Sequence, residues 1–209
     1  MIVAILASIA EILPIIFYLV FLKRNRGEGL WVIFFYCVFS ILTEVLYGIT
    51  KSHIIFSCFG LVQFALLSLF CYFSLRQKRL KIIPIVGAII FYVVAIANFS
   101  NRKFDSLSAS LASVLLIPYC ILLLYEEITD PMIDFIYNNK KFWVIIAILI
   151  YFSATLFLYL YYSTLSPEQQ SMYWSINNIS EILKNILFSV AFIMKKHYKN
   201  PYATDALEP

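Results

Sequence analysis

Apolar runs of about 20 residues recur along the whole chain, and they constrain the fold more strongly than any other feature. A helix of that length crosses a hydrocarbon core of roughly 30 Å and satisfies its own backbone hydrogen bonds, which lipid cannot do. Of the 209 residues, 62% are hydrophobic and 13% are charged, a composition outside the range of soluble domains. The sequence therefore predicts an all-α membrane protein.

Seven apolar runs are separated by polar segments. We expect transmembrane helices at about residues 1–22, 30–50, 54–75, 82–99, 105–125, 142–162 and 173–194, with Asp105 as the N-cap of the fifth. Residues 1–199 then form a single seven-helix domain. Residues 200–209 are polar and follow the last run, so we predict that they form a disordered cytoplasmic tail.

The distribution of Lys and Arg predicts the orientation, because cytoplasmic loops carry an excess of both. With the N-terminus outside, only three of the 16 lie on the outer side, namely Lys51, Arg102 and Lys103. One more, Lys184, lies inside the last run, and the other twelve lie on the cytoplasmic side. The sequence therefore predicts an outside N-terminus and a cytoplasmic C-terminus.

Several functional classes find little support in the sequence. The basic residues cluster at the ends of apolar runs, as topology signals do, so the net charge of +4 does not predict nucleic-acid binding. The four cysteines include no CxxC pair, and His53 and His197 are expected near opposite membrane faces, so we predict no metal site. No Ser, Cys or His arrangement predicts catalytic residues, and no cofactor is implied.

The last apolar run carries an unusual polar stripe. At helical spacing its polar residues share one face, and they are Asn177, Asn178, Glu181, Lys184 and Asn185. A charged residue near the bilayer centre costs roughly 2.5 to 3.5 kcal/mol, so this face must meet other helices or water. The stripe therefore predicts an intramembrane polar pocket.

Three polar residues from other runs are expected at similar depths, namely Glu11, Glu44 and Gln63. We predict that these three and the stripe form one ligand-binding site for a small polar or cationic ligand or a partner's membrane helix. Three glutamates against one lysine require protons, a cation, a basic ligand or water. Structural alternatives remain: Glu181 and Lys184 neutralise one another, Glu11 and Glu44 are neutral acids, and the asparagines join helices.

The cytoplasmic segment 126–141 contains a second candidate surface. Asp130 and the following proline suit the start of a short helix, and its apolar face would include Met132, Ile133, Phe135 and Ile136. We predict either a helix lying on the inner leaflet or a docking site for a cytoplasmic signalling partner.

Two resemblances bear on function. Trp31 and Trp143, Thr43 and Thr155, and Tyr47 and Tyr159 align between the second and sixth runs. With Pro14 matching Pro118, this suggests a 3+1+3 parallel repeat that resembles SWEET-type sugar carriers, although the proline-glutamine motif of the related PQ-loop family is absent.

The sixth and seventh runs carry Phe142-Trp143, Tyr151-Phe152-Ser153, Asn177-Asn178-Ile179 and Asn185-Ile186-Leu187-Phe188. These residues resemble the seven-helix membrane regions that precede bacterial histidine-kinase modules or stand alone. That resemblance implies a sensor or accessory subunit of the bacterial inner membrane, and a small-solute or proton-coupled transporter is the alternative. A lysine midway along the last helix also suits a retinal protein, but Ser180 stands where the type 1 rhodopsin pattern has an acid.

Overall fold

The computed structural model describes residues 2–25, 29–99, 105–129 and 136–195, and all regular structure within these ranges is helical. The elements are α1 (Ile2–Val20), α2 (Leu22–Asn25), α3 (Leu30–Thr50), α4 (His53–Ser74), α5 (Ile82–Ala97), α6 (Ser106–Ile128), η1 (Ile136–Asn138), α7 (Lys140–Tyr161), η2 (Tyr162–Thr164) and α8 (Pro167–Ile193). The predicted tail 200–209 and the docking residues Asp130, Met132, Ile133 and Phe135 lie outside the described residues. Ile136, the remaining docking candidate, begins η1 and is half-buried.

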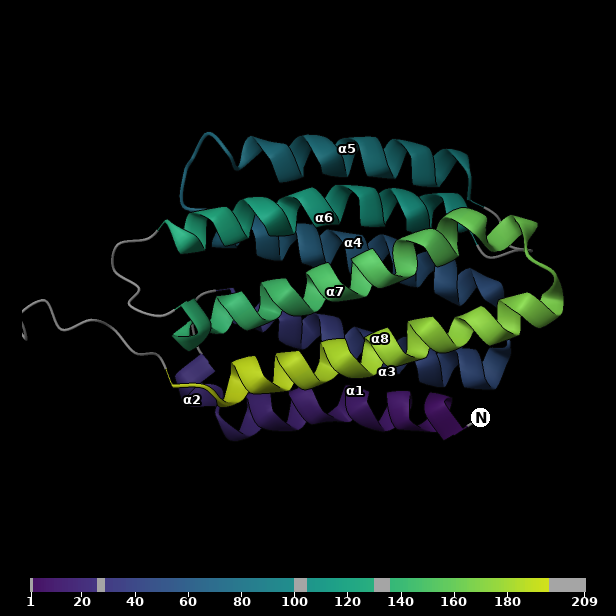
Figure 1. Cartoon of the computed structure of the whole chain (residues 1–209), viewed down its shortest axis with the longest axis horizontal. Coiled ribbons are helices and arrows are strands. Elements are labelled where there is room, and N and C mark those ends of the chain that lie inside the picture. Colours follow the sequence, from purple (N-terminus) through teal and green to yellow (C-terminus); the bar gives the residue numbers. More distant parts are fainter. Residues whose placement is uncertain (1, 26–28, 100–104, 130–135, 196–209) are drawn as a thin grey trace, which may run out of the picture.

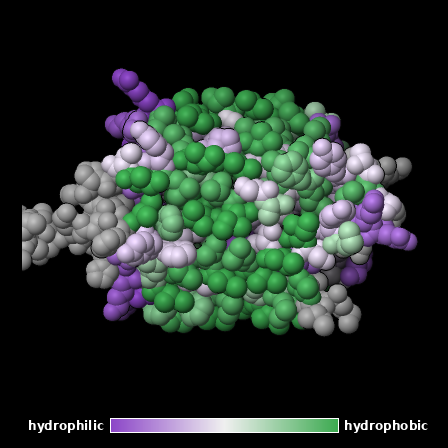
Figure 2. Space-filling view, in the orientation of Figure 1, coloured by the Kyte–Doolittle hydropathy of each residue, from purple (hydrophilic) through white to green (hydrophobic). Residues whose placement is uncertain are grey.

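Five helices, α3, α4, α6, α7 and α8, are long and apolar enough to cross a membrane. Helices α1 and α5 are also apolar but shorter, and the 16 residues of α5 span about 24 Å. On the face drawn in Figure 2, hydrophobic side chains cover the middle of the molecule and hydrophilic ones gather toward its two ends. The predicted class, an all-helical multi-pass membrane protein, agrees with these features.

Six of the described helices form a closed ring (Figure 1). Each packs against the next in the order α1, α3, α4, α6, α7, α8 and back to α1. Helix α5 lies outside the ring, where it packs against α4 and α6. Helices α1, α4, α6 and α8 begin at one end of the bundle, which we call the pocket end, and they finish at the other, which we call the locked end.

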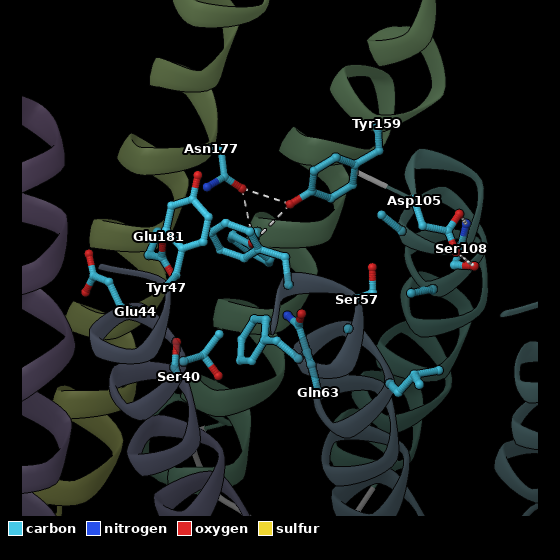
Figure 3. A pocket seen from close by; sticks show the side chains of 18 of the residues that line it. Ser40, Glu44, Tyr47, Ser57, Gln63, Asp105, Ser108, Tyr159, Asn177 and Glu181 are labelled. Atoms are coloured by element: carbon cyan, nitrogen blue, oxygen red, sulfur yellow. Dashed lines mark hydrogen bonds between the residues drawn. The ribbon is translucent and has the colours of Figure 1, made fainter. Parts of the chain in front are cut away.

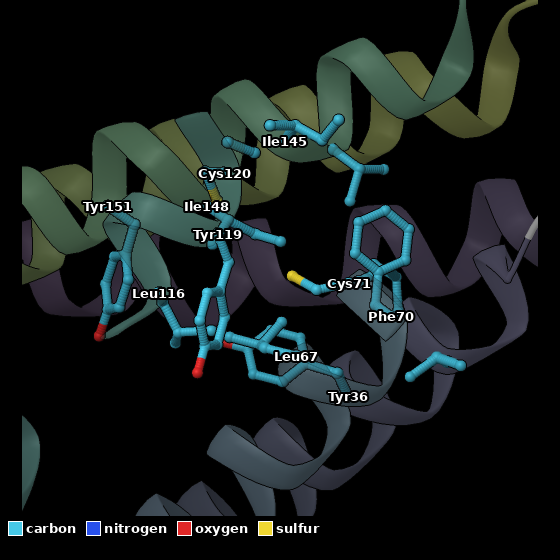
Figure 4. Packing of buried hydrophobic residues seen from close by; sticks show 14 of the residues in the cluster. Tyr36, Leu67, Phe70, Cys71, Leu116, Tyr119, Cys120, Ile145, Ile148 and Tyr151 are labelled. Carbon is cyan, nitrogen blue, oxygen red and sulfur yellow. The ribbon is translucent and has the colours of Figure 1, made fainter. Parts of the chain in front are cut away.

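A hydrophobic core fills much of the ring (Figure 4). Leu67 of α4, Leu116 of α6 and Ile148 of α7 are almost completely buried, and so is Tyr36 of α3. Burying such side chains against one another excludes lipid and water from the middle of the bundle. The buried polar residues of α8, Asn177, Lys184 and Asn185, thus meet protein rather than lipid.

Helix α8 begins six residues earlier than the sequence pattern predicted. Ser166 accepts a hydrogen bond from the backbone N–H of Gln169, and the Gln169 side chain accepts one from the backbone N–H of Ser166. Pro167 occupies the first helical turn, where its missing N–H costs nothing. This capping box starts the helix in a polar stretch before the apolar run.

Polar side chains join the helices at the locked end. Lys140 donates hydrogen bonds from its Nζ to the carbonyl oxygen of Arg24, at 2.9 Å, and to Oδ1 of Asn25, at 2.8 Å. Asn25 donates to the carbonyl oxygen of Phe192, and the Arg24 guanidinium donates to the carbonyl oxygens of Phe192 and Ile193. A cation at these last carbonyls satisfies groups that the end of α8 leaves unpaired.

A second set of contacts at the same end involves two acids of α6. Glu126 accepts hydrogen bonds from the backbone N–H groups of Arg76 and Gln77, at 2.9 and 3.2 Å. Glu127 is buried and contacts the Arg76 guanidinium at 3.4 Å and the Asn139 side-chain amide. These bonds connect α4, α6 and α7, so the locked end is closed by hydrogen bonds and ion pairs.

Candidate functional site

A cavity of about 330 Å³ occupies the ring at the pocket end (Figure 3). Its lining comes from the first halves of α1, α4, α6 and α8 and from the second halves of α3, α5 and α7. Six of the eight predicted ligand-binding residues line it: Glu11, Glu44, Gln63, Asn177, Asn178 and Glu181. The structure therefore brings together residues that are up to 170 positions apart in the chain.

Glu11 is the most deeply buried of the acids in the lining. It retains 6% exposure, and its Oε1 accepts a hydrogen bond of 2.7 Å from the Ser40 hydroxyl. Its Oε2 is buried and has no hydrogen-bond partner among the described residues. A buried carboxylate oxygen without a donor is costly, so this atom requires a proton shared with the neighbouring Glu181 carboxyl, a cation or a ligand donor.

The other two glutamates are more accessible. Glu44 is exposed, and its Oε1 accepts a hydrogen bond of 2.5 Å from the Ser8 hydroxyl. The Glu181 side chain is 19% exposed, and its Oε1 lies 3.1 Å from Nζ of Lys184. Three carboxyl groups thus converge on the cavity from α1, α3 and α8.

Lys184 lies outside the cavity lining and is buried within the bundle, with 2% exposure. Its ammonium donates a hydrogen bond of 2.8 Å to the Tyr36 hydroxyl and forms an ion pair with Glu181 at 3.1 Å, the contact of the structural alternative in which the two residues neutralise one another. The ammonium also lies 5.0 Å from the ring centre of Tyr36 and 4.5 Å from that of Tyr151, within cation–π range. The protein therefore supplies this ammonium with two hydrogen-bond acceptors and two aromatic faces of its own.

Asn185 is the other predicted site residue outside the lining. It is buried, and its Nδ2 has no hydrogen-bond partner among the described residues. The stripe therefore divides between Asn177, Asn178 and Glu181, which face the cavity, and Lys184 and Asn185, which lie deeper.

Tyrosines supply much of the polar wall, and the sequence analysis did not identify them as site residues. Asn177 Oδ1 accepts hydrogen bonds from the Tyr159 and Tyr151 hydroxyls, at 2.8 and 3.1 Å (Figure 3). Gln63 donates a hydrogen bond of 3.4 Å to the Tyr36 hydroxyl, which connects Gln63 to Lys184. Because 15 tyrosines are spread through the chain and these three lie on other helices than the stripe, no signal in the sequence singles them out.

The wall of the cavity is rich in acids. Asp105 joins the three glutamates, although its carboxylate also caps α6 through the backbone N–H and hydroxyl of Ser108. None of the described residues in the lining is Lys or Arg, and aromatic residues such as Tyr47, Tyr151 and Trp174 lie among the acids. Acids and aromatic faces together suit an organic cation.

Comparison with known proteins identifies no relative. No protein-family model, curated protein or solved structure matches the chain. Among the described residues, no group of three or more His, Cys, Asp or Glu is arranged to hold a metal ion.

Proposed function

We propose that this protein binds a small organic cation in the acid-rich cavity and acts as a sensor or accessory subunit in a bacterial inner membrane. The observation that carries the proposal is the unpaired, buried Oε2 of Glu11 in a cavity whose lining contains four acids. Of these four acids, Glu181 is the only one with which Lys184 forms a hydrogen bond or ion pair within the described part of the chain. An ammonium group would offset part of the remaining charge and supply hydrogen-bond donors.

The proposed membrane arrangement places all seven apolar helices across the bilayer, with the N-terminus outside. The excess of Lys and Arg at the locked end supports a cytoplasmic location for that end. The cavity then lies in the outer half of the membrane. A change caused by ligand binding in the cavity would pass along the helices to the locked end. A separate signalling partner would respond to that change there.

Binding of butylammonium to the protein in lipid nanodiscs, measured by titration calorimetry, tests the proposal. We expect wild-type protein to bind butylammonium but not 1-butanol, which has similar size and no charge. Glu11→Gln should weaken binding about tenfold to a hundredfold, because it removes one charged hydrogen-bond acceptor from a buried site. Glu168→Gln is the matched control, since Glu168 is exposed at the start of α8 and lies outside the lining.

Absence of butylammonium binding to the wild type, or equal affinity in the wild type and Glu11→Gln, would overturn the proposal. If Glu168→Gln weakens butylammonium binding as much as Glu11→Gln does, the weaker binding reflects the charge of the protein surface and not the cavity.

A small-solute or proton-coupled transporter is the second candidate, and the ring supports it. Around the ring, α1, α3 and α4 are followed by α6, α7 and α8, and each helix of the first set runs in the same direction as its counterpart in the second. Parallel repeats around a central site are typical of one class of carriers. Accumulation of labelled butylammonium in proteoliposomes would favour transport, and binding without flux would favour the sensor.

A further inference from the structure

The cavity has a second part, an apolar arm, which extends from the glutamates toward α5. Figure 3 shows Glu44 and Glu181 on one side of the drawn lining and Asp105 and Ser108 on the other, with Gln63 and Ser57 between them. The arm is lined mainly by apolar residues of α4, α5 and α6, namely Gly60, Leu61, Phe91, Ala95, Ala109 and Ala112. The cavity therefore holds the glutamates on one side, and the other side is apolar except for Ser57, Asp105 and Ser108.

Small residues create the arm. Gly60 of α4 and Ala109 and Ala112 of α6 occupy the lining where longer side chains would fill the space. A Cβ atom added to Gly60 would meet nothing within 4 Å, so free volume lies directly beside this residue. Phe91 supports the arm from α5 by stacking on buried Phe64, with ring centres 3.9 Å apart.

Helix α5 is firmly attached to the ring, so the arm is a built feature of the packed bundle. The Tyr92 hydroxyl donates a hydrogen bond of 2.9 Å to the carbonyl oxygen of Leu61 on α4. On the other side, Gly87 lets Tyr119 of α6 approach closely, and the Tyr119 hydroxyl donates to the carbonyl oxygen of Ile83 at 3.4 Å. Both neighbours of α5 therefore hold it across the junction of α4 and α6.

We infer that the ligand is an amphipathic amine, with its ammonium among Glu11, Glu44 and Glu181 and its apolar part in the arm. This inference rests on the proposed function and specifies the class of ligand. A purely hydrophilic cation would leave the apolar walls of the arm uncovered, whereas an alkyl group would bury them. The far side also holds Asp105, whose two oxygens accept hydrogen bonds from the neutral Ser108, so a dication is the competing ligand class that the test below includes.

Affinity for a series of primary ammonium ions tests the inference. In nanodiscs, we expect affinity to rise about fourfold for each methylene from methylammonium to butylammonium, the gain for burying a methylene in an apolar site. Gly60→Leu should fill the entrance to the arm and weaken butylammonium binding at least tenfold more than methylammonium binding. Gly48→Leu is the matched control, because a Cβ at Gly48 also meets nothing within 4 Å and Gly48 lies outside the lining.

The outcomes separate the two proposals. Binding of all the ammonium ions with equal affinity would overturn the amphipathic ligand and leave the cation site standing, whereas no binding by any of them would overturn both. Tighter binding of 1,4-diammoniobutane than of butylammonium would replace the amphipathic ligand by a dication. Equal butylammonium affinity in Gly60→Leu and the wild type would also overturn the arm; if Gly60→Leu does not fold, Ala109→Leu makes the same test from α6.

Discussion

At the scale of single residues, Lys184 provides a test of what holds the polar interior together. Its ammonium is buried and contacts Tyr36, Tyr151 and Glu181. Lys184→Met should destabilise the fold by about 3 kcal/mol, the lower end for breaking a buried pair, since Glu181 keeps some exposure to solvent. Thermal unfolding in nanodiscs, followed by intrinsic fluorescence, measures the effect.

Two further variants show whether a loss of stability in Lys184→Met comes from the buried ion pair. Lys195→Met removes a lysine exposed at the end of α8 and should leave the unfolding temperature unchanged. Glu181→Gln combined with Lys184→Met should recover part of the loss, because it removes the unpaired charge along with its partner. Equal unfolding temperatures for Lys184→Met and Lys195→Met would show that the buried pair contributes nothing to stability.

The sequence was informative about charged and amide side chains of the site and silent about its tyrosines. Glu11, Glu181 and Lys184 stand out within apolar runs because charges in lipid are costly, and the structure places all three inside the bundle. Tyr36, Tyr151 and Tyr159 have both an apolar ring and a polar hydroxyl. The same residue type suits lipid, core and pocket alike, so only the packed structure identifies these three as site residues.

At the scale of elements, the contact between α5 and α6 depends on one glycine. A Cβ atom at Gly87 would lie 1.6 Å from the Tyr119 hydroxyl oxygen and 3.0 Å from the ring carbon that bears it. Gly87→Ala should therefore displace Tyr119 and lower stability by about 1 to 3 kcal/mol, the usual cost of overpacking. Chemical or thermal unfolding of the variant measures this cost, and Gly48→Ala, which meets no neighbour, should show none of it.

A double-mutant cycle identifies the contact responsible. In a Tyr119→Phe background the closest atom is gone, so Gly87→Ala should cost less than it does in the wild type. An unchanged cost in that background would show that Tyr119 is not the obstacle.

The sequence predicted the helices well because hydrophobic length is a local property. The second apolar run matches α3 residue for residue, at Leu30–Thr50. The largest difference is at the start of α8, where Ser166, Pro167 and Gln169 begin the helix within a polar segment. A rule based on apolar length misses such a start, whereas the spacing of cap residues would have found it.

At the scale of the whole molecule, the sequence did not predict the order of helices around the ring. Helix α5 is more apolar than its neighbours α4 and α6, but that composition alone does not indicate that it lies outside the ring and packs across the junction of α4 and α6. The arm of the cavity follows from that placement. Its lining residues, such as Gly60 and Ala109, therefore escaped a search for polar residues.

The orientation of the bundle decides whether the cavity faces the outside. Variants with a single cysteine, in a background in which Cys37, Cys58, Cys71 and Cys120 are replaced by alanine, can be labelled with a maleimide that does not cross membranes. Because Lys and Arg concentrate at the locked end, we expect Asn98→Cys at the pocket end to react in intact cells. Lys78→Cys, in the exposed segment between α4 and α5, should react only after permeabilisation. The opposite pattern would place the cavity on the cytoplasmic side, so a ligand would reach the glutamates from inside the cell and the proposed outward-facing sensor would be wrong.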